Sequence, residues 1–151
     1  MIDKGYCQSL IDDLCQEYSM PKIEVSFDTS LFTTESAGGQ FNFLIMKIVV
    51  DENEPELLEI LFHEFRHYWQ YIHYPEIFFW WTCCSGGLYK KYYHTAFCSI
   101  EEDARVFGTS HGTEDREDLL RAYDASFLSF LKDEPGSLRQ ILQALGVDKM
   151  W

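Results

Sequence analysis

The chain has 151 residues, of which 46% are apolar and 17% aromatic, and its formal net charge is −13. This composition predicts one packed domain spanning residues 1–151 and argues against a disordered chain. The negative charge repels phosphate backbones and anionic membrane surfaces, so neither nucleic acid nor a membrane is expected as a partner.

The N-terminal segment predicts a helix and no export signal. Residues 3–18 carry apolar side chains at helical spacing, among them Leu10, Ile11 and Leu14. The first twenty residues lack the basic start and apolar stretch of a secretory signal, and the longest apolar run, residues 77–84, is too short to cross a bilayer. We therefore expect a cytoplasmic protein with five free cysteine thiols.

Two strands and a long helix are expected next. The segment KIEVSFD, residues 22–28, alternates apolar and polar side chains, and FNFLIMKIVVD, residues 41–51, is rich in β-forming residues. The following DENEPE predicts a helix start, with Asn53 as N-cap and Pro55 in the first turn.

The rest of the chain is expected to be mostly helical, over residues 99–108, 114–132 and 137–145. The predicted class is therefore α+β. An N-terminal helix is followed by a small, mainly antiparallel sheet, a central helix and further helices packed on one side of the sheet.

The central helix carries the pattern that points to chemistry. On a helical wheel its apolar residues form one stripe, made of Leu58, Phe62, Phe65, Trp69 and Ile72. His63, Glu64 and His67 fall on the opposite side and spell H-E-x-x-H. Residues four apart lie one turn apart on the same face, so two imidazoles can bind one cation, usually zinc. Glu64 is then placed to take a proton from metal-bound water and pass it to a leaving amine.

Two residues compete as third ligand. His73 has the histidine spacing of H-E-x-x-H-x-x-G-x-x-H, but Gln70 stands where that pattern needs glycine for a sharp turn. If the helix continues, His73 lies about 9 Å beyond His67 along the axis. The alternative is Glu101, in SIEEDARVFG, which shares a helix face with the small residue Ala104.

The neighbouring carboxylates are weaker candidates. Glu102 is the remaining alternative to Glu101 as a ligand, and Asp103 is expected to orient a ligand imidazole at most. An oxyanion donor is expected among five residues of which none stands out: Tyr89, Tyr92, Tyr93, His94 and His111. Gly86 and Gly87 suggest either a flap hinge or a plain turn.

Together, HEFRHYWQ and IEEDARVFG resemble the gluzincin metallopeptidases, and more narrowly the small cytoplasmic peptidases of the ImmA/IrrE type and minigluzincins. Their second motif reads roughly E-x-x-A-x-x-F-A, which Glu101, Ala104, Phe107 and Gly108 match, whereas Arg105 replaces a frequent asparagine. The resemblance covers about residues 20–110.

This resemblance implies a zincin-like domain with one zinc ion bound by His63, His67 and Glu101 and with Glu64 as general base. It also implies that MKIVVD, residues 46–51, is an edge strand that pairs with an extended peptide, although an ordinary strand within the sheet is an equally open alternative. The expected activity is zinc-dependent hydrolysis of a peptide or protein, and the sequence predicts no oligomeric state. The alternative is a non-catalytic binding or sensor module on the same scaffold.

Overall fold

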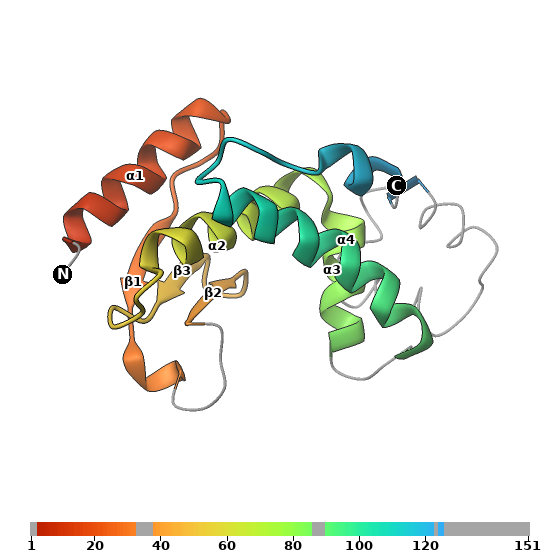
Figure 1. Cartoon of the computed structure of the whole chain (residues 1–151), viewed down its shortest axis with the longest axis horizontal. Helices are drawn as coiled ribbons and strands as arrows, with labels where there is room; N and C mark the ends of the chain where they lie inside the picture. The colour runs from red at the N-terminus through yellow and green to blue at the C-terminus, as the bar shows by residue number, and fades with distance from the viewer. Residues whose placement is uncertain (1–2, 33–37, 86–89, 123, 126–151) are drawn as a thin grey trace. The chain divides into compact units, whose positions relative to one another are not determined.

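The computed structural model describes residues 3–32, 38–85, 90–122 and 124–125, and these form an α+β fold (Figure 1). The described elements are, in chain order, α1 (Lys4–Glu17), β1 (Glu24–Phe27), the 3-10 turn η1 (Thr29–Phe32), β2 (Gly39–Asn42), β3 (Lys47–Val50), α2 (Leu57–His73), α3 (Pro75–Ser85) and α4 (Lys90–Thr109). The predicted α+β class is confirmed. Within these ranges, no helix is long and apolar enough to cross a membrane.

The described residues divide into two compact units. The first contains the chain up to Trp69 together with Ala104–Glu114, and the second contains Gln70–Asp103 and the residues from Asp115 onward. Helices α2 and α4 each contribute residues to both units, because one boundary between the units lies at Trp69/Gln70 in α2 and another at Asp103/Ala104 in α4.

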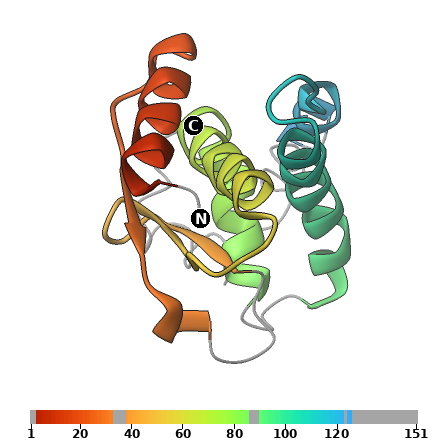
Figure 2. The ribbon, with the colours of Figure 1, turned by 60° about the vertical axis from the view of Figure 1, so that its left-hand side comes forward.

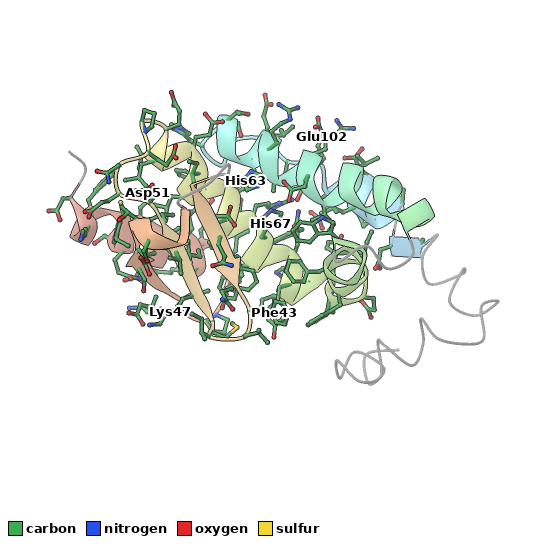
Figure 3. All side chains as sticks on the ribbon, turned by 90° about the horizontal axis from the view of Figure 1, so that it is seen from below. Phe43, Lys47, Asp51, His63, His67 and Glu102 are labelled. Carbon is green, nitrogen blue, oxygen red and sulfur yellow. The ribbon has the colours of Figure 1, made fainter. Side chains whose placement is uncertain are left out.

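The sheet of the first unit has three strands in the order β1-β3-β2. Strand β3 pairs in parallel with β1 and antiparallel with β2, so that Ile48 lies opposite both Val25 and Phe41. The sheet is therefore mixed, and the expectation of a mainly antiparallel sheet is wrong. The expectation that residues 46–51 form an edge strand is also wrong, since β3 is the central strand. In Figure 3, Lys47 is the first residue of β3 and Asp51 directly follows its last residue.

Residues 41–51 form a hairpin and not the single strand that their composition predicts. The side chain of Asn42 accepts hydrogen bonds from the backbone N–H groups of Leu44 (3.0 Å) and Ile45 (3.4 Å). The side-chain oxygen takes the place of a backbone acceptor in a neighbouring strand, and the chain therefore bends into a turn. Met46 completes the reversal with a φ of 52°, in the left-handed region. Local hydrogen bonding therefore overrides the β propensity of this run.

Helix α1 begins and ends as its sequence predicts. The Asp3 side chain caps it by accepting a hydrogen bond from the Gly5 N–H at 2.8 Å. One face is buried through Cys7, Ile11, Leu14 and Cys15. Both of these cysteines are free thiols, and burial raises the pKa of each.

Helix α2 starts later than expected and is buried on more than one side. Glu56, and not Asn53, supplies the first helical acceptor, to the Ile60 N–H at 3.0 Å, while the Asn53 N–H bonds to the Asp51 carboxylate. Of the expected apolar stripe, Phe62, Phe65 and Trp69 are buried, whereas Leu58 is half-buried and Ile72 is exposed. Four polar residues of the helix are buried as well: Glu64, Arg66, His67 and Gln70.

Aromatic packing joins the helices of the first unit around Phe107. The ring of Phe107 lies 6.0 Å from that of Phe65 on α2 and 6.2 Å from that of Tyr18, which ends α1. Figure 2 shows α2 lying between α1 and the C-terminal end of α4. On the other side of α2, Phe41 of β2 packs against Tyr68 at 5.5 Å. These contacts place β2 and the end of α4 on either side of the H-E-x-x-H segment.

The described residues of the second unit are mostly helical. The apolar run at residues 77–84 lies in helix α3, and α4 begins at Lys90, nine residues before the expected start. After α4, residues 117–122 are again helical, and Tyr74 donates a hydrogen bond to Glu117 across the unit at 3.1 Å. Only the first part of the helix expected at 114–132 is described, and the one expected at 137–145 lies outside the described residues.

Candidate metal centre

The two histidines of the motif meet on one side of α2 (Figure 3). Their Nε2 atoms are 3.1 Å apart, and the rings are nearly perpendicular, at 77°. Lone pairs of two neutral imidazoles repel one another at this distance unless a proton or a cation lies between them. Two nitrogens bound tetrahedrally to one zinc ion at 2.0–2.1 Å are about 3.3 Å apart. The pair therefore already has the spacing of two ligands on one ion.

A carboxylate completes the group. The ligand atoms of His63, His67 and Glu101 all lie within 4.8 Å of one another, close enough to hold a metal ion. His67 is buried, while His63 and Glu101 are partly exposed, so the group is accessible from solvent. Two imidazoles and one carboxylate are a donor set that zinc uses when a coordination position stays open.

Gly108 explains how the end of α4 comes close to α2. A Cβ at this position would lie 2.8 Å from the Glu59 carbonyl oxygen and 3.1 Å from the Cβ of His63. Real side chains do not tolerate the first of these distances, so only glycine allows this contact. Because Glu101 precedes Gly108 by two helical turns on α4, it lies on the same face of that helix.

Gln70 makes a second connection between the same two helices, within the second unit. It is fully buried, and its amide donates to the Ile100 carbonyl at 2.9 Å and to the Asp103 carboxylate at 2.8 Å. These acceptors flank Glu101 in the sequence. Sequence reasoning treated Gln70 only as the absence of a turn-forming glycine. Its role could have been suspected because Gln70 lies one turn after His67.

The other residues considered as metal ligands, or as supports for them, lie outside the group of His63, His67 and Glu101. Helix α2 continues through His73, whose side chain is exposed at the helix end. Among the described residues, the metal-ligand group includes neither His73 nor Glu102. Asp103 is fully buried and accepts a second hydrogen bond from the Arg116 N–H at 2.8 Å, next to the helical stretch that begins at residue 117.

Glu64 is held by the sheet. Its exposed fraction is 6%, and its Oε2 accepts a hydrogen bond from the backbone N–H of Phe41 at 2.8 Å. A buried carboxylate needs such a donor, because loss of hydration is otherwise uncompensated. This contact between residues 23 positions apart has no signal in the sequence.

Arg66 is a second buried charge that sequence reasoning did not use. Its guanidinium is fully buried and stacks on the Trp69 ring at 3.6 Å, with the Phe107 ring at 5.0 Å. Such cation–π stacking stabilises a desolvated guanidinium by about 2 kcal/mol. Arg66 thus belongs to the packing between α2 and the end of α4.

The structure describes one of the expected oxyanion donors. His111 is exposed, and its ring stacks on Phe62 with 5.3 Å between centroids and 4° between planes. Tyr89, Gly86 and Gly87 lie outside the described residues, as do the side chains of Tyr92, Tyr93 and His94.

Comparison of the chain with protein-family models, curated proteins and solved structures finds no match. Function is therefore inferred from the chemistry and geometry of these residues.

Proposed function

We propose that this chain is a zinc-dependent peptidase with a zincin-like fold, acting on a peptide or protein substrate. The observation that carries the proposal is that two imidazoles on α2, the helix that also bears the buried Glu64, and one carboxylate on α4 lie within 4.8 Å of one another. One bound zinc ion, held by His63, His67 and Glu101, would supply Lewis acidity toward a water molecule and the scissile carbonyl.

Glu64 does the proton transfer in this proposal. Its carboxylate accepts a proton from the attacking water as the oxygen bonds to the carbonyl carbon. It then delivers this proton to the amine nitrogen as the C–N bond breaks, which leaves a carboxylic acid and a free amine. The place of Glu64 supports the role, because it directly follows the proposed ligand His63 on α2 and is buried from bulk water.

The outer edge of β2 is the proposed site for an extended substrate. Among the described strands, β2 lies at one edge of the sheet and touches Glu64 through Phe41. The Phe41 N–H on this edge donates to Glu64, so a peptide would pair with the other outward backbone groups and gain main-chain hydrogen bonds irrespective of its sequence. The two buried free thiols, Cys7 and Cys15, favour a reducing compartment such as the cytoplasm.

Metal content is the first test. The purified chain, dialysed against zinc, should hold one zinc ion per molecule by mass spectrometry under native conditions. His67→Ala and Glu101→Ala should lose it, whereas Glu102→Ala and His73→Ala should keep it. A wild-type chain that takes up no zinc, or a Glu101→Ala variant that binds zinc as tightly as wild type, contradicts the proposed ligand set.

Hydrolysis is the second test. Zinc-loaded protein is incubated with a mixed peptide library in ¹⁸O-labelled water, and newly formed C-termini are detected by their label. Glu64→Gln should retain zinc and lose at least a hundredfold in turnover, because the amide cannot accept the proton. Equal rates for Glu64→Gln and the parent would rule out Glu64 as the base.

A further inference from the structure

We propose that strand β2 positions the Glu64 carboxylate, with the Phe41 N–H as its anchor and Gly39 as the residue that lets the strand lie against it. The catalytic meaning of this inference rests on the proposed peptidase function. The positioning itself is a property of the fold, and all of its residues belong to the first unit.

The anchor is a buried hydrogen bond to a charged group. The Phe41 N–H donates to Glu64 Oε2 at 2.8 Å, and both residues are at most 9% exposed. A hydrogen bond to an ionised acceptor is roughly twice as strong as one between neutral groups, and here water does not compete for it. The Glu64 side chain therefore has one strongly preferred orientation.

The Phe41 N–H lies on the edge of β2 that faces away from β3. Its hydrogen bond to Glu64 therefore leaves the hydrogen bonds between β2 and β3 intact. Successive residues of a strand direct their N–H and C=O groups to opposite edges. The carbonyl of Gly38 points inward, toward β3, since it accepts the Asp51 N–H at 2.8 Å, and Gln40 has the same orientation. Gly39 and Phe41 therefore direct their backbone groups outward. The strand can hold Glu64 and keep its ladder with β3.

Gly39 supplies the close contact. A Cβ there would lie 2.4 Å from Ile60 Cγ2 and 3.1 Å from Glu64 Cγ. The φ of Gly39 is not in the left-handed region, so steric contact alone requires the glycine. The same hypothetical Cβ would be 3.5 Å from Glu64 Oε1. The carboxylate therefore lies along the strand, between residues 39 and 41.

A base held in this way is preorganised. A free glutamate on a helix samples several rotamers, and a displacement of about 1 Å can reduce turnover a hundredfold. The hydrogen bond from the backbone of β2 removes this freedom. Phe41 and Gly39 are thus positioning residues, and Glu64 is the catalytic residue.

The test compares Phe41→Pro with Phe41→Ala. Both variants lose the ring that packs on Tyr68, but only proline also removes the N–H. Proline is tolerated here because the missing N–H faces away from the ladder. With both variants loaded with zinc to the same extent, Phe41→Pro should have a kcat at least tenfold below that of Phe41→Ala, with the same KM for a library peptide.

Amide hydrogen exchange tests the anchor without any activity. The Phe41 amide should exchange at least tenfold faster in Glu64→Ala and in Gly39→Ala than in wild type, whereas the Val49 amide in the central strand should be unchanged. Equal Phe41 exchange in wild type and Glu64→Ala overturns the inference, as does equal kcat for the two Phe41 variants. If no chain hydrolyses peptides, the peptidase proposal fails, and exchange alone decides whether β2 positions Glu64.

Discussion

Buried and partly buried charged side chains are balanced in three different ways in this protein. Glu64 receives a backbone hydrogen bond from β2, and Arg66 stacks on Trp69. Asp124 is only partly buried, and its folded form shifts toward protonation, since burial, and to a smaller extent the charge of Glu76, raise its pKa to about 6. This carboxyl therefore titrates close to neutral pH.

We expect Asp124→Asn to change how stability depends on pH. The folded state raises the pKa of this carboxyl above its unfolded value of 3.8, so folding favours the protonated form. The stabilising contribution is complete below pH 3.8 and is lost as pH rises through about 6. Since Asp124 is only partly buried, the variant should gain about 1 kcal/mol at pH 7.5 and almost nothing at pH 4.

Urea unfolding of both chains at the two pH values measures this difference. Asp118→Asn, an exposed substitution on the same helical stretch, should leave the pH dependence of the unfolding free energy as in wild type. An Asp124→Asn profile parallel to that of the parent would show that the carboxyl does not titrate in this range.

At the scale of elements, the candidate metal centre depends on how α2 and α4 are joined. Gly108 allows close backbone contact beside His63, and Gln70 forms hydrogen bonds on both sides of Glu101. The contact at Gly108 requires the absence of a side chain, whereas the contact at Gln70 is made by hydrogen bonds. Helix α4 is long enough to make both contacts, because it begins at Lys90 and runs to Thr109.

Gln70→Ala should weaken zinc binding without removing a ligand. The change leaves the Ile100 carbonyl and the buried Asp103 carboxylate without this donor, so the helix segment that carries Glu101 becomes less well held. We expect zinc affinity to fall about tenfold or more, as for other losses of a hydrogen bond that supports metal ligands.

Competition titration with a chromophoric chelator gives this affinity. Gln16→Ala, on an exposed part of α1, is the matched control and should bind zinc as wild type does. Wild-type affinity in Gln70→Ala would show that the Gln70 hydrogen bonds contribute only to folding.

At the scale of the whole molecule, metal binding and folding are expected to be coupled. The ligands come from two helices that are far apart in the sequence, so the unfolded chain has no such group. A ligand that binds only the folded state stabilises it by about 2.7 kcal/mol when present at a hundred times its dissociation constant. The net charge of −13 adds a general attraction for cations, which makes a metal control necessary.

Zinc should therefore raise the melting temperature by about 5–10 °C, given about 2–4 °C per kcal/mol for a chain of this size. Mg²⁺ at the same concentration should have little effect, because it prefers oxygen ligands over imidazole. His67→Ala should melt at the same temperature with and without zinc. Scanning calorimetry measures all three, and an equal shift with Mg²⁺ would point to general charge screening.

The sequence determined the parts of this protein that depend on local periodicity. The predicted α1 differs from the observed helix by one residue at each end, and the i, i+4 spacing placed His63 and His67 together, because both follow from the geometry of one helix. Glu101 was also preferred from the chain as third ligand, with His73 and Glu102 as alternatives, and it is the carboxylate that lies beside the two histidines. Turn chemistry was underestimated at Asn42, so two strands were expected as one.

Only the tertiary structure decided which distant groups meet. The strand order, with β3 in the centre, is one such decision. The hydrogen bond between Phe41 and Glu64 joins residues 23 positions apart, and the one between Gln70 and Asp103 joins residues 33 positions apart. Such pairings depend on the packing of whole elements, and no local pattern encodes which residue of one element faces a given residue of another. The chain specifies its helices and ligand types locally, and packing selects the partners that surround them.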